Sequence, residues 1–168
     1  LDPRARLFAE PFAFKMARQQ GINVPDFDPQ GKLKKPGIKI VHSPDFDFRT
    51  TTYRFVDALE EIKLWSDANP THIPIFLLLE LKSDSFSPFT RPIAWDETGF
   101  QTLETEILSV WPLERILTPD VLRGERETLR EAVDGVGWPE LNSQRGKVVF
   151  LMDNEGRERD LYLRPSPI

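Results

Sequence analysis

The chain has 168 residues and a net charge of −5, with 39% hydrophobic and 29% charged residues. This composition is typical of one folded domain of ordinary size, and the acidic balance disfavours a nucleic-acid partner, which would require a basic face. The longest apolar run, Ile75 to Leu79, is far shorter than the roughly 18 residues of a transmembrane helix, and the absence of cysteine excludes disulfides and thiolate metal sites.

The first predicted elements are a strand and a helix. Gly37 to His42 is short and β-branched and follows the turn residues Lys-Lys-Pro-Gly, which predicts a strand. An amphipathic helix is predicted from about Thr51 to Asp67, and the pair Asn69-Pro70 ends it. Its apolar positions recur at helical spacing: Phe55, Ala58, Leu59, Ile62 and Trp65.

A second strand and a second helix follow. Pro74 to Lys82 is a nearly continuous apolar run, which predicts a strand buried on both faces, as in a parallel sheet. A helix is predicted from about Thr98 to Trp111, with Thr98 and Gln101 as a capping box at its start. Its inner face consists of Phe100, Leu103, Ile107, Val110 and Trp111.

The last predicted elements are short helices and a third strand. Thr118-Pro119-Asp120 is typical of a helix start, a short helix is expected from about Glu125 to Val133, and a strand from Lys147 to Asp153. Strands that alternate with helices predict an α/β fold with a parallel sheet. Three clear strands are too few to close an eight-stranded barrel, so a small open α/β domain stays an alternative on pattern alone.

Polar residues stand at the carboxyl ends of these strands: His42, Glu80 with Lys82, and Asp153. In parallel α/β folds, active sites are built at this end of the sheet. Because side chains alternate along a strand, Glu80 and Lys82 are expected on the same face as Leu78.

Each of these residues also has a purely structural interpretation. A single histidine at a strand end is more often structural than catalytic, and Glu80 with Lys82 forms an ordinary ion pair if both are exposed. Glu80 and Lys82, however, directly follow a strongly apolar run. A charged side chain near a buried interior is unfavourable unless it is paired or binds a ligand. Asp153-Asn154 is interpreted as a turn opener.

Other polar residues are weaker candidates. His72 precedes the second strand, at the end opposite the expected site, and is interpreted as a loop or packing histidine. Asp45, Asp47 and Arg49 follow His42 in a loop on the favourable side, where they could line a site, although acidic loops of this kind are usually just solvated.

Several segments resemble the calcium-dependent phosphoinositide phospholipase C family of bacteria and fungi. The specific part is "GIKIVHSPDFDFRTT" followed by "FVDALEEIKLWSDANPTHIPIFLLLELK", which have the family's order and spacing. Weaker similarity lies in "DPRARLFAEP" at the start and "GKVVFLMD" near the end, so that the resemblance spans most of Asp2 to Asp153.

The resemblance implies a TIM-type (β/α) barrel, of which residues 1–168 would be an incomplete part within one domain. It implies an active site with two histidines and Ca²⁺, in which His42 is the second histidine, Glu80 a calcium ligand and Lys82 a contact for substrate phosphate. The family's first histidine, its neighbouring Asn and a Glu-x-Asp pair of ligands all precede the position of Asp2. The chain is therefore expected to be a fragment, and a protein that truly began at Leu1 would be inactive as a hydrolase.

The activity implied is calcium-dependent cleavage of phosphatidylinositol-type lipids to diacylglycerol and inositol phosphate, with His42 protonating the leaving oxygen. The implied partner is a phospholipid, with peripheral membrane contact hypothesised through Phe86, Phe89 and Trp95, and an extracellular or periplasmic location is expected. Two alternatives are a glycerophosphodiester phosphodiesterase and a catalytically inactive barrel that binds lipid head groups or carbohydrate.

Overall fold

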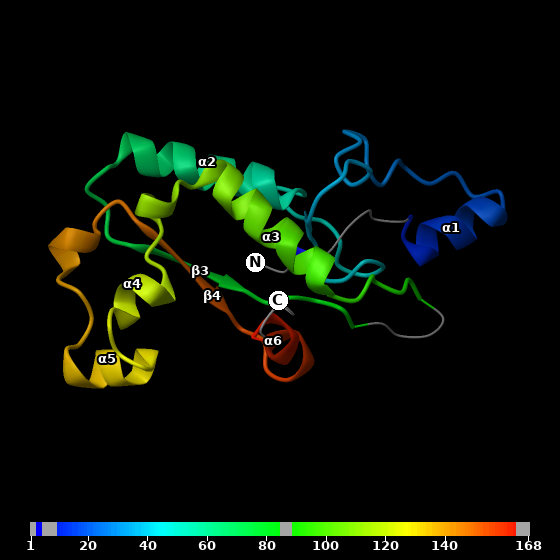
Figure 1. The fold of residues 1–168 in the computed structure, drawn as a ribbon. Coiled ribbons are helices and arrows are strands. Elements are labelled where there is room, and N and C mark those ends of the chain that lie inside the picture. Colours follow the sequence, from blue (N-terminus) through cyan, green and yellow to red (C-terminus); the bar gives the residue numbers. More distant parts are fainter. Residues whose placement is uncertain (1–2, 5–9, 85–88, 164–168) are drawn as a thin grey trace.

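The computed structural model describes residues 3–4, 10–84 and 89–163 and shows the mixed α/β fold expected (Figure 1). The helices and strands, in chain order, are β1 (Pro3–Arg4), α1 (Phe12–Gln19), β2 (Lys39–Ile40), α2 (Phe55–Ala68), β3 (Ile75–Leu79), α3 (Glu97–Val110), α4 (Pro119–Arg123), α5 (Leu129–Gly135), β4 (Val148–Met152) and α6 (Arg157–Tyr162). Short 3-10 turns lie at Leu113–Arg115 and Leu141–Gln144.

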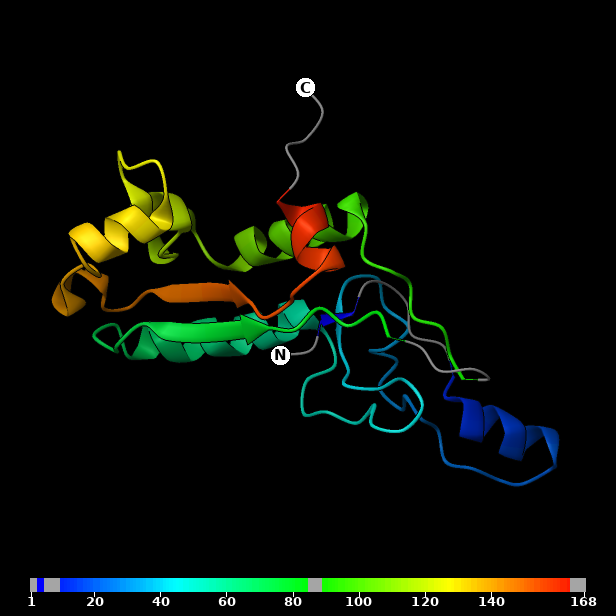
Figure 2. The same cartoon turned by 90° about the horizontal axis from the view of Figure 1, so that it is seen from below.

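The centre of the fold is the parallel pair of β3 and β4, which runs in register from Ile75 opposite Val148 to Leu79 opposite Met152. The predicted parallel pairing of these strands is therefore confirmed. Figure 2 shows the two strands side by side, with α2 behind β3 and α3 beyond the edge of β4, and side chains of both helices share one buried cluster with β3. Among the described residues, no helix lies across the near face.

This one-sided covering sets the burial pattern of β3. Leu77 and Leu79 are buried against the helices, whereas Phe76 and Leu78 are 54% and 49% exposed. Alternation of this kind is what a strand shows when only one of its faces is packed. The prediction that this strand is buried on both faces is thus wrong for the described residues, because α2 and α3 lie together on the same face.

The core between the helices and the sheet matches the predicted inner faces closely. The buried cluster takes Phe55 and Leu59 from α2 and Phe100 and Leu103 from α3. Burial of each such side chain contributes about 1.5–3 kcal/mol to the stability of this layer. Trp65 was expected on the inner face of α2 but is mostly exposed.

The starts of the helices differ in part from the prediction. The side chain of Asp96 caps α3 by accepting a hydrogen bond of 2.8 Å from the backbone N–H of Gly99. The predicted capping box of Thr98 and Gln101 is wrong, since both residues lie inside the helix. A carboxylate two positions earlier is a strong cap because it also carries negative charge at the positive end of the helix dipole.

Two later helix starts follow the same physical rules. Thr118 caps α4 as predicted, with proline at the first helical position. The next helix, however, begins at Leu129 and not near Glu125. Its start is set by a complete capping box, in which the side chains of Thr128 and Glu131 each accept a hydrogen bond from the other's backbone N–H.

The predicted first strand is present but pairs differently from the expected parallel arrangement. β2 pairs with β1 in antiparallel orientation. On its other side, the N–H of Ile40 donates to the carbonyl of Tyr53, and the N–H of Phe55 donates to the carbonyl of Ile38, both at 2.9 Å. The segment that leads into α2 therefore occupies the backbone groups that a parallel neighbour would need.

β2 also carries a buried cation. The side chain of Lys39 is nearly fully buried, and its ammonium donates to the carbonyls of Lys35 and Gly37 at 2.6 and 2.5 Å. Burial lowers the pKa of Lys39 to about 8, although the Glu106 carboxylate acts in the opposite direction. Glu106 belongs to α3 and accepts a hydrogen bond of 2.9 Å from the N–H of Ile38, so that β2 is fastened to the helix layer.

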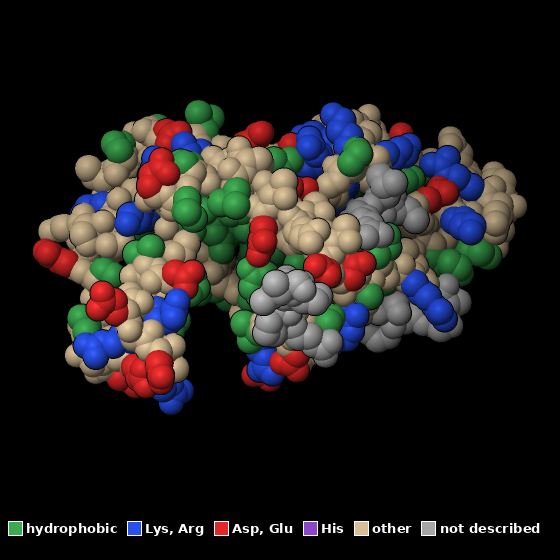
Figure 3. Space-filling model, in the orientation of Figure 1, with side chains coloured by type: hydrophobic (Ala, Val, Ile, Leu, Met, Phe, Trp, Pro, Cys, Tyr) green, Lys and Arg blue, Asp and Glu red, His purple; other side chains and the backbone are tan. Residues whose placement is uncertain are grey.

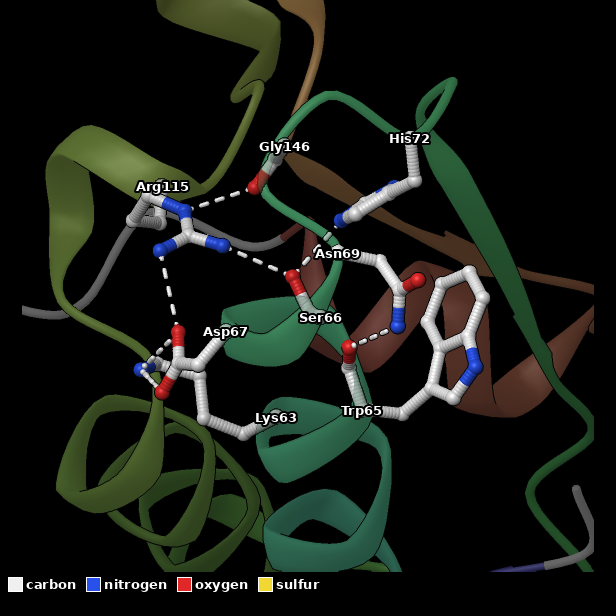
Figure 4. A network of polar contacts seen from close by, with 8 residues as sticks. All are labelled: Lys63, Trp65, Ser66, Asp67, Asn69, His72, Arg115 and Gly146. Atoms are coloured by element: carbon white, nitrogen blue, oxygen red, sulfur yellow. Dashed lines mark hydrogen bonds and ion pairs between the residues drawn. The ribbon is translucent and has the colours of Figure 1, made fainter.

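The end of the sheet opposite His42 is held by Arg115 (Figure 4). Its guanidinium donates to the carbonyl of Gly146 at 2.6 Å, to the hydroxyl of Ser66 at 2.7 Å and to the carboxylate of Asp67 at 3.2 Å. His72 lies 2.6 Å from the same buried Ser66 hydroxyl. The interpretation of His72 as a packing histidine is confirmed, and the network ties the end of α2 to the turn before β4.

We expect Arg115→Lys to lower the free energy of unfolding by about 1–3 kcal/mol, because lysine cannot reproduce the planar array of donors and leaves buried acceptors unpaired. Urea unfolding measures the change. Arg130→Lys on the exposed surface of α5 is the matched control and is expected to be neutral. Equal unfolding free energies for the two variants would contradict this assignment.

Candidate functional site

Glu80 and Lys82 lie directly beyond the carboxyl end of β3. Leu81 between them is buried in the core, so Glu80 continues the face of β3 that carries Phe76 and Leu78. The Lys82 ammonium lies against the Glu80 carboxylate as an ion pair. This pairing agrees with the predicted shared face of Glu80 and Lys82.

His42 acts electrostatically on the same carboxylate. The pKa of Glu80 is held below its ordinary value, chiefly by the hydrogen bond from Lys82, with further contributions from the positive charges of Lys82 and His42. His42 lies 38 positions before Glu80 in the sequence, and its contribution to the pKa of Glu80 is smaller than that of Lys82. The ion pair brings Lys82 and Glu80 together, whereas the membership of His42 in the same site and the chemical roles of all three residues stay predictions.

The loop after His42 is compact. The N–H of Ser43 donates to the carbonyl of Asp47 at 3.0 Å, and the N–H of Asp47 donates back to the carbonyl of Ser43 at 3.2 Å. These two bonds close the loop and bring Oδ2 of Asp47 to 3.1 Å from Nδ1 of His42. The sequence placed Asp47 only in a loop near the site, whereas the structure places it against the histidine ring.

Asp45 fixes this loop to two distant segments. Its carboxylate accepts hydrogen bonds from the N–H of Phe12 at 2.6 Å and from both the N–H and the hydroxyl of Thr90 at 2.8 Å. Phe12 begins α1, and Thr90 lies in the connection that follows β3. Sequence reasoning gave Asp45 no definite role, because its partners are 33 and 45 residues away.

The end of β4 fixes the end of β3. Beyond the last paired residues, the N–H of Asp153 donates to the carbonyl of Leu79 at 2.9 Å. The Asn154 side chain then accepts from the N–H of Leu81 at 2.7 Å and donates to its carbonyl at 2.9 Å. Asn154 thereby imitates one further step of strand pairing and holds the backbone between Glu80 and Lys82. The sequence interpretation as a plain turn missed this contact.

The carboxylate of Glu80 suits a hard cation such as Ca²⁺, which binds six to eight oxygen ligands. Within the part of the chain that the structure describes, no group of three or more His, Cys, Asp or Glu residues is arranged to hold a metal ion. The role of Glu80 as a calcium ligand therefore stays a prediction.

An aromatic cluster lies beside the His42 loop. The Phe46 side chain is 68% exposed, and its ring centroid is 4.6 Å from that of Phe89, which in turn is 5.4 Å from that of Phe12. Trp95 is fully buried and stacks on the ring of Phe100, so its predicted membrane contact is wrong. Phe86 lies outside the described residues.

Three further findings bear on the function of the chain. Across the described segments, no helix is both long and apolar enough to cross a membrane. A family model described as "Phosphoinositide phospholipase C, Ca2+-dependent" matches residues 1–168. No curated protein sequence matches the chain.

Solved structures show the same likeness. A Ca²⁺-dependent phosphatidylinositol-specific phospholipase C from Streptomyces antibioticus is 23% identical, with a TM-score of 0.53, over 70% of this chain and 40% of that chain. A calcium-dependent phosphoinositol-specific phospholipase C from a Pseudomonas species is 22% identical, with a TM-score of 0.50, over 70% of this chain and 41% of that one. At these identities the likeness shows the fold alone, and the chain spans about 40% of the length of these structures.

We expect Asp45→Asn to loosen the loop after His42. An amide offers one acceptor oxygen and turns its NH₂ group toward the donors of Phe12 or Thr90, which lowers the free energy of unfolding by about 1–3 kcal/mol. Amide hydrogen exchange at Thr90 is the local measurement and should become faster. Asp134→Asn, on the exposed surface of α5, is the control. Unchanged protection of Thr90 in Asp45→Asn would show that this anchor is unimportant.

Proposed function

Because the chain belongs to the Ca²⁺-dependent phosphoinositide phospholipase C family, we propose that it supplies part of the active site of a calcium-dependent phosphodiesterase that cleaves phosphatidylinositol-type lipids. The products would be diacylglycerol and inositol phosphate. The observation that carries the proposal is the ion pair of Glu80 and Lys82 directly beyond the carboxyl end of β3, the end of a parallel strand at which barrel enzymes build their active sites.

We further propose that residues 1–168 form part of a single TIM-type barrel domain. The parallel pair of β3 and β4, with α2 and α3 on one face, has the layering of a barrel wall. The apolar side chains Phe76 and Leu78 on the open face would then point to the barrel interior, where such side chains pack in layers. The charged residues of the site would stand at the rim of the same face.

In the proposed reaction a hydroxyl of the inositol ring attacks phosphorus, and the bond from phosphorus to the glycerol oxygen breaks. His42 donates a proton from its ring to that oxygen, so that diacylglycerol leaves as a neutral alcohol. The proton of the attacking hydroxyl goes to a second base, for which the described residues near His42 offer no second histidine. A cyclic inositol phosphate forms first, and water then opens it.

Lys82 and Glu80 would exchange partners when substrate binds. The Lys82 ammonium, paired here with Glu80, would contact the phosphate oxygens of the lipid. The Glu80 carboxylate would then be available as one oxygen ligand of calcium. Calcium, when bound, lowers the pKa of the attacking hydroxyl and offsets the charge that develops at phosphorus.

The direct test is the release of inositol phosphate from phosphatidylinositol by the intact protein, with calcium and with a calcium chelator. Release is expected only with calcium, and His42→Ala should lower kcat about 10²- to 10⁴-fold. His72→Gln is the matched control, because His72 lies at the opposite end of the sheet, and it should keep its kcat. An intact protein that releases no inositol phosphate, or releases it equally with chelator, would refute the proposal.

The two alternative functions are a glycerophosphodiester phosphodiesterase and an inactive binding barrel. The family match favours neither of them. Both would show in the same assay, the first as hydrolysis of water-soluble glycerophosphodiesters and the second as absence of any turnover. An extracellular or periplasmic location stays a prediction.

We also propose that Phe46 and Phe89 touch the membrane that holds the substrate. Phe46 is exposed, and its loop begins at His42. Residues 12–54 contain eight Lys and Arg against four Asp, a net +4 in a chain whose total is −5. Figure 3 shows Lys and Arg side chains gathered over the end of the molecule that carries α1. A basic segment beside an exposed aromatic ring suits an anionic bilayer.

Phe46→Ser should weaken binding to phosphatidylcholine vesicles that contain phosphatidylserine by a factor of about 10 to 100, since the transfer of one phenyl ring from water is lost. Vesicle sedimentation measures the partitioning. Leu64→Ser removes an equally exposed apolar side chain from α2 and should have no effect. Equal losses in the two variants, or no loss in either, would contradict a membrane contact at Phe46.

A further inference from the structure

The ring of His42 is held by a carboxylate. Nδ1 of His42 lies 3.1 Å from Oδ2 of Asp47, and both side chains are more than half exposed. An ionised carboxylate can only accept hydrogen bonds, so the proton of this bond belongs to Nδ1 of the histidine. In a reaction the proton would then be gained or lost at the other ring nitrogen, Nε2.

The backbone places Asp47 there. The two reciprocal hydrogen bonds between Ser43 and Asp47 close the loop independently of the side chains. Val41 and Phe48, just outside the two ends of this loop, are buried in one apolar cluster with Phe27 and Leu33. The backbone therefore positions the Asp47 carboxylate next to the His42 ring. This matters because an exposed ion pair alone supplies too little energy to hold two side chains in one geometry.

The carboxylates of Asp45 and Glu80 are engaged with other partners. Asp45 uses its oxygens for the donors of Phe12 and Thr90, and Glu80 is paired with Lys82. Of these three acidic side chains, Asp47 is the one that makes a hydrogen bond to the histidine ring.

We propose that Asp47 is the positioning residue of His42: it fixes the ring with Nδ1 protonated and Nε2 directed to the leaving oxygen. The catalytic consequence of this inference rests on the proposed function, whereas the orientation of the ring does not. When the imidazolium gives up its proton, the N–H bond at Nε2 breaks and an O–H bond forms on the glycerol oxygen. Nδ1 keeps its proton and its bond to Asp47, which stays ionised and never touches the substrate.

The first test needs no substrate. Nitrogen chemical shifts of the intact protein with ¹⁵N-labelled histidine report the tautomer of each neutral ring, and His42→Ala identifies the signal of His42. The wild-type ring is expected to carry its proton on Nδ1. In Asp47→Ala the ring should change mainly to the Nε2-protonated form, which free imidazole side chains prefer. A ring that is protonated on Nε2 in the wild type, or that keeps the Nδ1 proton in Asp47→Ala, would overturn the proposal.

The second test separates positioning from binding. Asp47→Ala should lower kcat for phosphatidylinositol cleavage about tenfold with little change in KM, because the bond lost is a single charge-assisted hydrogen bond at an exposed site. Asp47→Glu should restore part of kcat, and Asp134→Asn should change neither constant. A raised KM at unchanged kcat would overturn the role in catalysis. If the wild type releases no inositol phosphate, the proposed function is refuted. The tautomer of His42 measured by nitrogen chemical shifts still decides separately whether Asp47 holds the ring.

Discussion

The parallel pairing of β3 with β4, packed by α2 and α3 on one face only, is the constraint from which the rest of the structure follows. Because the helices cover one face, alternate residues of β3 are buried, and the others, Phe76 and Leu78, are exposed. The same alternation carries Glu80 onto the open face at the carboxyl end of the strand. The direction of the strand that leads to His42 is fixed by the backbone bonds of β2 with the segment leading into α2.

Polar side chains, and not apolar packing, fix the two ends of this sheet. Arg115 holds the amino-terminal end through a buried serine, a carboxylate and a carbonyl. Asn154 holds the carboxyl end by pairing with both backbone groups of Leu81, and Asp45 fastens the loop after His42 to two distant segments. These contacts lie where the chain leaves regular structure and backbone groups would otherwise lack partners. Asn154 and Asp45 thereby hold the backbone next to Glu80 and after His42.

The sequence was sufficient where its periodicity reports local structure. The amphipathic pattern of residues 51–67 and the apolar runs of residues 74–82 and 147–153 predicted α2, β3 and β4 and placed Glu80 at a strand end. It was insufficient where the outcome depends on distant partners. An apolar run does not show what covers each face, so exposure of Phe76 was missed, and the role of Asn154 depends on a residue 73 positions away. Asp47 was visible only as one acidic residue in a loop.

The central claim is that His42 and Glu80 belong to one calcium-dependent site. A crystal structure of the intact protein with bound calcium tests it most directly. We expect a carboxylate oxygen of Glu80 at about 2.3–2.6 Å from the ion, with the His42 ring facing the same cavity and Asp47 still at Nδ1. Calcium bound without Glu80, or a His42 ring turned away from the ion's cavity, would contradict this account.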